Sequence, residues 1–125
     1  MGKVFELEIE TTNKEEIIDI TSEIEYIVEQ RDIEEGMICL YVPHTSAAVT
    51  IHRKLDDPKK PRLPELLEKV NPEEEASPYT KAALVAPTEI LVVKDRKVIL
   101  GSNQRIYLYE FNGPKKRRMF MYISD

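Results

Sequence analysis

Both histidines of this 125-residue chain lie in one segment, VPHTSAAVTIH at residues 42–52. The first, His44, is followed directly by the hydroxyl residues Thr45 and Ser46. An imidazole beside hydroxyl groups can act in acid–base catalysis, bind a metal ion or contact an anionic ligand. A serine nucleophile would need its base within hydrogen-bond distance, whereas adjacent side chains on an extended segment often point apart. We therefore expect the hydroxyls to cap a turn or to contact a ligand.

The same segment also has the pattern of a half-buried strand. Apolar residues occupy every second position from Ala47 to Ile51, and more polar residues lie between them. A strand with one face in the core and the other in water has this pattern without any chemistry. From the residues alone, the structural and the chemical interpretations both remain open.

The chain offers few metal ligands. Besides the two histidines it has one cysteine, Cys39, which lies in the apolar run MICLYV and is expected to be a buried structural side chain. A catalytic zinc ion needs about three protein ligands. His44 and His52 could meet across folded strands or a subunit interface, with Asp56 or Asp57 as a carboxylate ligand, but they lack the spacing of two ligands on one helical turn. We expect no tight metal site and no cofactor.

Cationic side chains could bind a phosphorylated ligand. Lys81, Arg105 and the basic run at residues 115–118 supply positive charge and hydrogen-bond donors. The chain has only four glycines and no glycine-rich phosphate loop, which disfavours nucleotide hydrolysis of the P-loop type. The alternative is that these charges are the solvated ends of strands, and this is the simpler interpretation of Lys115 and Lys116 beside the Asn-Gly-Pro turn.

Composition restricts the class of protein. A content of 42% hydrophobic and 33% charged residues indicates one soluble globular domain over residues 1–125. No apolar run approaches the roughly 18 residues of a spanning helix, and the N-terminus lacks the apolar block of a signal peptide, so we expect a cytoplasmic protein without membrane contact. The net charge of −5 disfavours nucleic-acid binding, which usually requires a basic face to neutralise phosphates. Abundant Ile, Val, Glu and Lys, with eight prolines, are typical of a heat-adapted source.

Periodicity predicts a first strand followed by one long helix. Apolar and acidic residues alternate over residues 5–10, as in an amphipathic strand. Thr12 or Asn13 could then cap a helix that continues to Gly36. The residues at helical spacing that would form its buried face are Ile17, Ile20, Ile24, Ile27 and Val28.

The rest of the chain is mostly strands. Residues 37–42 are continuously apolar, which predicts a central strand that ends at Pro43, and residues 47–52 predict the next strand. A short helix is expected at residues 63–70, and a loop at residues 71–80. Four more apolar runs, EILVV, KVILG, RIYLYEF and RRMFMYI, are separated by short turns and predict an antiparallel meander. The fold class is therefore α+β.

Four pieces of the chain, in their order and spacing, resemble the YjbQ family, which is often described as secondary thiamine-phosphate synthase. They are VPHTSAAVTI, TKAALVAPT, the turn LG-x-x-Q-R-IYL-x-EF, and GPKKRR, and the resemblance covers roughly residues 36 to 122. It implies an α+β fold with a large antiparallel sheet and a cytoplasmic homotrimer. It also implies a polar site with histidines near the subunit boundary that can hold a metal ion.

The family's site residues match this chain unevenly. The histidine–hydroxyl turn, the lysine and the glutamine of the family fall on His44, Thr45, Ser46, Lys81 and Gln104. Tyr79 stands where the family has a further histidine, and Asn103 where it has a tryptophan. After the first turn, the family usually has Asn-Glu-Asn and an acidic residue. This chain has His52, Arg53, Lys54, Leu55 and Asp56 there, and only the aspartate is retained.

Three functional hypotheses follow from this comparison. The first is a weak thiamine-phosphate synthase-like enzyme that acts on a small phosphorylated metabolite, with His44 as acid/base or ligand and Lys81 as the phosphate partner. The second is a divergent homotrimer that lost most catalysis and serves as a binding or interaction protein for a small anion. The third is a basic contact to a polyanion through residues 115–118. The lost histidine favours the second, and the acidic net charge disfavours the third. The expected ligand-binding residues are Thr45, Ser46, Gln104 and Arg105.

Overall fold

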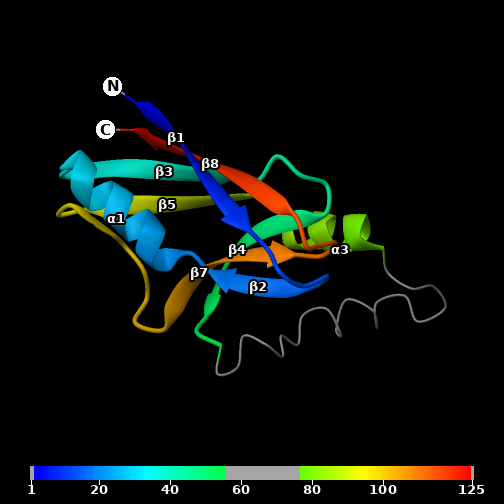
Figure 1. Cartoon of the computed structure of the whole chain (residues 1–125). Coiled ribbons are helices and arrows are strands. Elements are labelled where there is room, and N and C mark those ends of the chain that lie inside the picture. The colour runs from blue at the N-terminus through cyan, green and yellow to red at the C-terminus, as the bar shows by residue number, and fades with distance from the viewer. Residues whose placement is uncertain (1, 56–76, 125) are drawn as a thin grey trace.

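A computed structural model describes residues 2–55 and 77–124 and shows two antiparallel sheets (Figure 1). The five-stranded sheet has the order β1-β8-β3-β5-β6 and the three-stranded sheet the order β2-β7-β4. In chain order the strands are β1 Lys3–Glu10, β2 Glu16–Asp19, β3 Glu35–Tyr41, β4 Ala47–Arg53, β5 Thr88–Lys94, β6 Lys97–Val98, β7 Gln104–Glu110 and β8 Lys116–Ser124. The described helices are α1 Thr21–Arg31 and α3 Pro78–Val85.

The main core lies between the two sheets. The inner faces of both sheets and one side of α1 contribute to it, with fully buried residues such as Ile24, Leu40, Leu108 and Met121. A second, smaller cluster lies on the outer face of the three-stranded sheet, where α3 packs against β4. This α+β arrangement, with antiparallel pairing throughout the described strands, confirms the predicted fold class.

The central position of residues 37–42 is also confirmed. β3 pairs with β8 on one side and with β5 on the other, and Ile38 and Leu40 are fully buried on its inner face. Cys39 points to the opposite face and is only partly buried, so the expectation of a buried thiol is wrong. Side chains alternate along a strand, and the odd positions of β3 lie on the outer face of the sheet.

The prediction of one long N-terminal helix is wrong. Residues 16–19 form β2, whose Ile17 pairs with Tyr109 of β7, and α1 begins only at Thr21. The Asp19 carboxylate accepts a hydrogen bond from the Thr21 N–H at 3.0 Å at this boundary. The cause is tertiary: β-branched residues at 17 and 18 suit a strand, and β7 supplies backbone partners that the local sequence does not reveal.

The predicted meander is wrong as well. Asp95 and Arg96, both with positive φ, form a tight turn between β5 and β6. The chain then crosses to the three-stranded sheet as β7 and returns to the five-stranded sheet as β8, between β1 and β3. Short turns alone therefore did not reveal that consecutive strands change sheets.

The loop expected at residues 71–80 is replaced in its last part by the start of α3. Ser77 caps this helix by accepting a hydrogen bond from the Thr80 N–H at 3.1 Å, and Pro78 occupies the first turn. The helix expected at residues 63–70 lies outside the described residues. No helix in the described part of the chain is long and apolar enough to cross a membrane.

Candidate functional site

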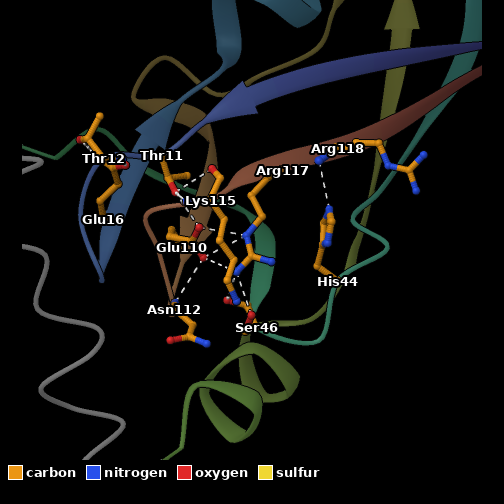
Figure 2. Close-up of polar contacts among 10 residues, drawn as sticks. All are labelled: Thr11, Thr12, Glu16, His44, Ser46, Glu110, Asn112, Lys115, Arg117 and Arg118. Atoms are coloured by element: carbon orange, nitrogen blue, oxygen red, sulfur yellow. Dashed lines mark hydrogen bonds and ion pairs between the residues drawn. The ribbon is translucent and has the colours of Figure 1, made fainter.

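A buried ion pair joins the two sheets where β7 ends and β8 begins (Figure 2). Arg117 of β8 and Glu110 of β7 are both almost fully buried. The Arg117 Nε donates to both carboxylate oxygens of Glu110, at 2.9 and 3.1 Å. Thr11 and the Asn112 backbone also donate to Glu110, at 2.7 and 3.2 Å. Buried charges are stable only when they are paired and hydrogen-bonded in this way.

The electrostatics of Glu110 follow from these contacts. Burial alone would raise the pKa of its carboxyl group, because a charge is poorly solvated inside the protein. The hydrogen bonds from Arg117, Thr11 and Asn112 outweigh burial and lower the pKa below its ordinary value. Glu110 is therefore a carboxylate at neutral pH and a structural partner of Arg117.

Ser46 belongs to the same network. Its hydroxyl accepts a hydrogen bond from Arg117 Nη2 at 2.7 Å, and its carbonyl accepts one from the Phe111 N–H at 3.0 Å. The residue is buried, whereas the neighbouring Thr45 is exposed. Ser46 thus positions the turn after β3, and its hydroxyl is already engaged with a guanidinium.

His44 lies beside the network in a cationic environment (Figure 2). Its Nε2 accepts a hydrogen bond from the Arg118 backbone N–H at 3.0 Å, which leaves the proton of the neutral ring on Nδ1. Partial burial and the charges of Arg117 and Arg118 lower the pKa of His44 below its ordinary value. At neutral pH the residue is therefore an uncharged imidazole with one N–H donor.

Lys81 lies on the other side of the three-stranded sheet. It is buried at the start of α3, and its Nζ donates to the Glu15 carboxylate at 2.7 Å. Burial and the nearby Glu15 raise the pKa of Tyr109, which stacks on Phe111 with ring centroids 4.8 Å apart. The sheet therefore separates Lys81 from the network around His44.

Gln104 and Arg105 lie at the far end of β7 from Glu110. Because β7 has seven residues, this distance is about 20 Å. The Gln104 side chain accepts a hydrogen bond from the Gly101 N–H at 2.7 Å, and Arg105 Nε donates to Asp19 at 2.8 Å. This pair raises the pKa of Arg105, and it lowers the pKa of Asp19 against the opposing effect of burial.

The two histidines lie at opposite ends of β4. His52 is exposed near its end and pairs across the ladder with Arg105, whereas His44 precedes its start. Within residues 2–55 and 77–124, no three His, Cys, Asp or Glu side chains are close enough to hold a metal ion. Asp56 and Asp57 lie outside the described residues, so the expectation of no tight metal site stays a prediction.

Comparisons with known proteins show the family of the chain. A family model described as "UPF0047 protein YjbQ-like" matches residues 5–125. The chain belongs to the YjbQ family. It is 34% identical to a UPF0047 protein of Archaeoglobus fulgidus, over 93% of this chain and 97% of that one. It is 32% identical to the UPF0047 protein YugU of Bacillus subtilis, over 92% and 94% of the two chains.

A solved structure shows the same fold. A structural-genomics target from C. acetobutylicum superposes with a TM-score of 0.86 at 31% identity and covers 97% of this chain and 98% of its own. YjbQ-family homologues also occur in archaea and in thermophiles. A solved YjbQ-like homologue is itself described as a protein of unknown function.

Sequence reasoning missed the Glu110–Arg117 pair in this YjbQ-family chain. A signal for it was present, because every second side chain of a strand lies on the same face of the sheet. Glu110 lies on the face of the buried Ile106 and Leu108. Arg117 lies on the face of the buried Met119 and Met121. A charged residue at a core position of a strand indicates a buried polar contact. Ser46 was predicted to contact a ligand, and the sequence did not indicate that its hydroxyl is bonded to Arg117.

Proposed function

We propose that this protein is a cytoplasmic homotrimer that binds a small anion, such as a phosphorylated metabolite, beside His44, with little catalysis. The observation that carries the proposal is the position of His44 between two arginines with its Nε2 already occupied by the Arg118 N–H. The Nδ1–H group and the exposed Thr45 hydroxyl are then the donors for an anion, in a region of positive potential.

The separation of the other candidate residues supports binding over turnover. The Ser46 hydroxyl is bonded to Arg117, and the Lys81 ammonium is bonded to Glu15 on the far side of the three-stranded sheet. Gln104 lies at the opposite end of β7. A catalytic group must be within hydrogen-bond reach of the reacting atoms, and in one subunit these groups do not converge on His44.

Binding of a polyanion through residues 115–118 is less well supported. Arg117 is buried with Glu110, and Arg118 lies 3.6 Å from Glu6. Lys116 lies 3.8 Å from both Glu8 and Glu10. Much of the positive charge of this run is therefore balanced within the chain, which disfavours extended contact with phosphate groups.

A pH titration of the protein with and without inorganic phosphate tests the anion site. NMR of the histidine ring protons gives the pKa of His44 in each condition. Bound phosphate should raise the pKa of His44, because a negative charge favours the imidazolium form. The exposed His52 reports nonspecific salt effects in the same sample. If the two histidines respond equally at millimolar phosphate, the proposed site is wrong.

The alternative is the weak thiamine-phosphate synthase-like activity that the family resemblance implies. A synthase assay with untagged protein should show little or no product, and metal analysis should show no stoichiometric zinc. One zinc ion per subunit together with synthase activity, both lost in His44→Ala, would show that the protein is an enzyme instead.

A further inference from the structure

Asn112 and Gly113 form the only Asn-Gly step of the sequence, in the turn between β7 and β8. An asparagine in this position can react with its own main chain, because glycine has no Cβ to hinder the approach of its nitrogen. The Gly113 nitrogen bonds to Asn112 Cγ, and the side-chain amide leaves as ammonia together with the Gly113 proton. Water then opens the cyclic imide, at Cγ to give aspartate or at the backbone carbonyl to give isoaspartate. The reaction needs no reagent other than water.

The fold requires glycine at position 113. A Cβ there would overlap the Asn13 carbonyl oxygen and lie 2.7 Å from Thr11 Oγ1. The overlapped atom belongs to the main chain, so a larger residue would displace the loop that joins β1 to β2. Close packing between this loop and the β7–β8 turn therefore fixes the glycine of the reactive step.

The Gly113 nitrogen is held by the same loop. Its N–H donates to the Lys14 carbonyl at 2.9 Å, and the Asn112 N–H donates to Glu110 at 3.2 Å. To react, the Gly113 nitrogen must lose its proton and turn toward Asn112 Cγ. The bond to Lys14 opposes the loss of the proton, because a hydrogen bond donated by a group favours its protonated form. Close packing opposes the rotation.

Thr11 fastens the loop to the turn (Figure 2). Its N–H donates to the Lys115 carbonyl at 2.9 Å, and its hydroxyl oxygen accepts a hydrogen bond from the Lys115 N–H at 2.9 Å. The same hydroxyl donates to the Glu110 carboxylate at 2.7 Å, and Thr11 is buried. The loop can leave the turn only when these bonds break, so its opening has a free-energy cost of its own.

We propose that Asn112 is a deamidation site that the folded chain keeps closed through Thr11, and that it reacts when the loop at residues 11–14 opens. The rate then follows the fraction of molecules in the open state. Isoaspartate adds one carbon atom to the main chain between residues 112 and 113. This displaces the Gly113 N–H from the Lys14 carbonyl, so the loop cannot close on the modified turn as before. The inference does not depend on the proposed anion site.

Peptide mapping by mass spectrometry after warm, mildly alkaline incubation tests the site. Asn112 should react at least about tenfold more slowly in the folded protein than in the urea-unfolded chain, because only the open fraction reacts. Asn103 is the internal control: it is exposed and precedes Gln104, whose side chain hinders the attack, so it should react slowly in both samples. Labelling with an isoaspartyl methyltransferase should detect the product in the wild type and much less in Asn112→Gln.

Substitution of Thr11 tests what closes the site. Thr11→Val removes the hydroxyl with little change in shape and should speed the reaction of the folded protein about tenfold, since it removes hydrogen bonds that hold the loop. Thr11→Ser keeps the hydroxyl and should keep the slow rate. Thr12→Val is the matched control, because the Thr12 hydroxyl donates to Glu16 at 3.2 Å in an exposed position. Circular dichroism and urea unfolding confirm that each variant is folded during the incubation.

The possible outcomes separate the parts of the inference. Equal rates at Asn112 in the folded and the unfolded chain would show that the fold does not close the site. If Asn112 does not react even in the unfolded chain, it is not a deamidation site. A Thr11→Val rate equal to those of the wild type and Thr12→Val would overturn the role of Thr11. A slow reaction in the folded wild type that becomes faster in Thr11→Val alone supports the inference.

Discussion

At the scale of single residues, the Glu110–Arg117 pair illustrates what a sequence shows and what it conceals. The alternation of side chains along a strand places both residues among the core positions, and from this a buried polar contact could have been predicted. The identity of the partners could not, because Ser46, Thr11 and Arg117 come together only through the packing of two sheets. His44 was predicted as a site residue, but its contact with the Arg118 backbone depends on the same packing.

Substitution Glu110→Gln should destabilise the protein strongly. It leaves the Arg117 guanidinium buried beside a neutral side chain, and breaking a buried pair in this way costs about 3–5 kcal/mol. Glu8→Gln is the control, because Glu8 and Lys116 form an exposed pair and should contribute less than about 1 kcal/mol. Urea unfolding measures both free energies. Equal losses in the two variants would contradict a structural role for the buried pair.

The lowered pKa of His44 should make stability depend on pH. Above pH about 6.5 the imidazole is neutral in both the folded and the unfolded chain, so its contribution to stability is complete. As the pH falls below this value, the unfolded chain takes up a proton before the folded one, and stability decreases until the folded pKa is passed.

His44→Gln should therefore flatten the stability profile between pH 7.5 and about 5, measured as urea midpoints. Glutamine keeps an acceptor for the Arg118 N–H but does not titrate. His52→Gln, at an exposed position, is the control and should keep the wild-type profile. An unchanged slope in His44→Gln would mean that another group causes the pH dependence.

At the scale of elements, long apolar runs were predicted well and boundaries were not. The runs that became β3, β7 and β8 suit strands whatever their partners are. Residues 16–19 fit the helical spacing of the isoleucines equally well, and only β7, about 90 residues later in the chain, decides that they form β2. The change of sheet between β6 and β7 is equally non-local. Neither feature is encoded in a short window of sequence.

The N-cap of α3 is a local feature that can be tested directly. Ser77→Ala removes the acceptor for the Thr80 N–H and should cost about 1 kcal/mol in urea unfolding. Ser77→Asp supplies another capping oxygen and should restore most of the loss. If Ser77→Asp is as unstable as Ser77→Ala, the serine contributes through some contact other than the cap.

At the scale of the whole molecule, β8 connects the proposed anion site beside His44 to the outer face of the five-stranded sheet. The Arg118 backbone N–H donates to His44, whereas its side chain lies on the outer face, 5.5 Å from the Phe120 ring and 3.6 Å from Glu6. The His44 site and this outer face are therefore linked through one residue of β8.

The proposed assembly should make thermal stability depend on protein concentration. Association stabilises the folded state by mass action, so a tenfold rise in concentration should raise the Tm of the wild type by roughly 2–4 °C for a chain of this size. Calorimetry over a hundredfold concentration range measures the Tm. A Tm that is constant over this range would show that unfolding is not coupled to dissociation, which would contradict the proposed homotrimer.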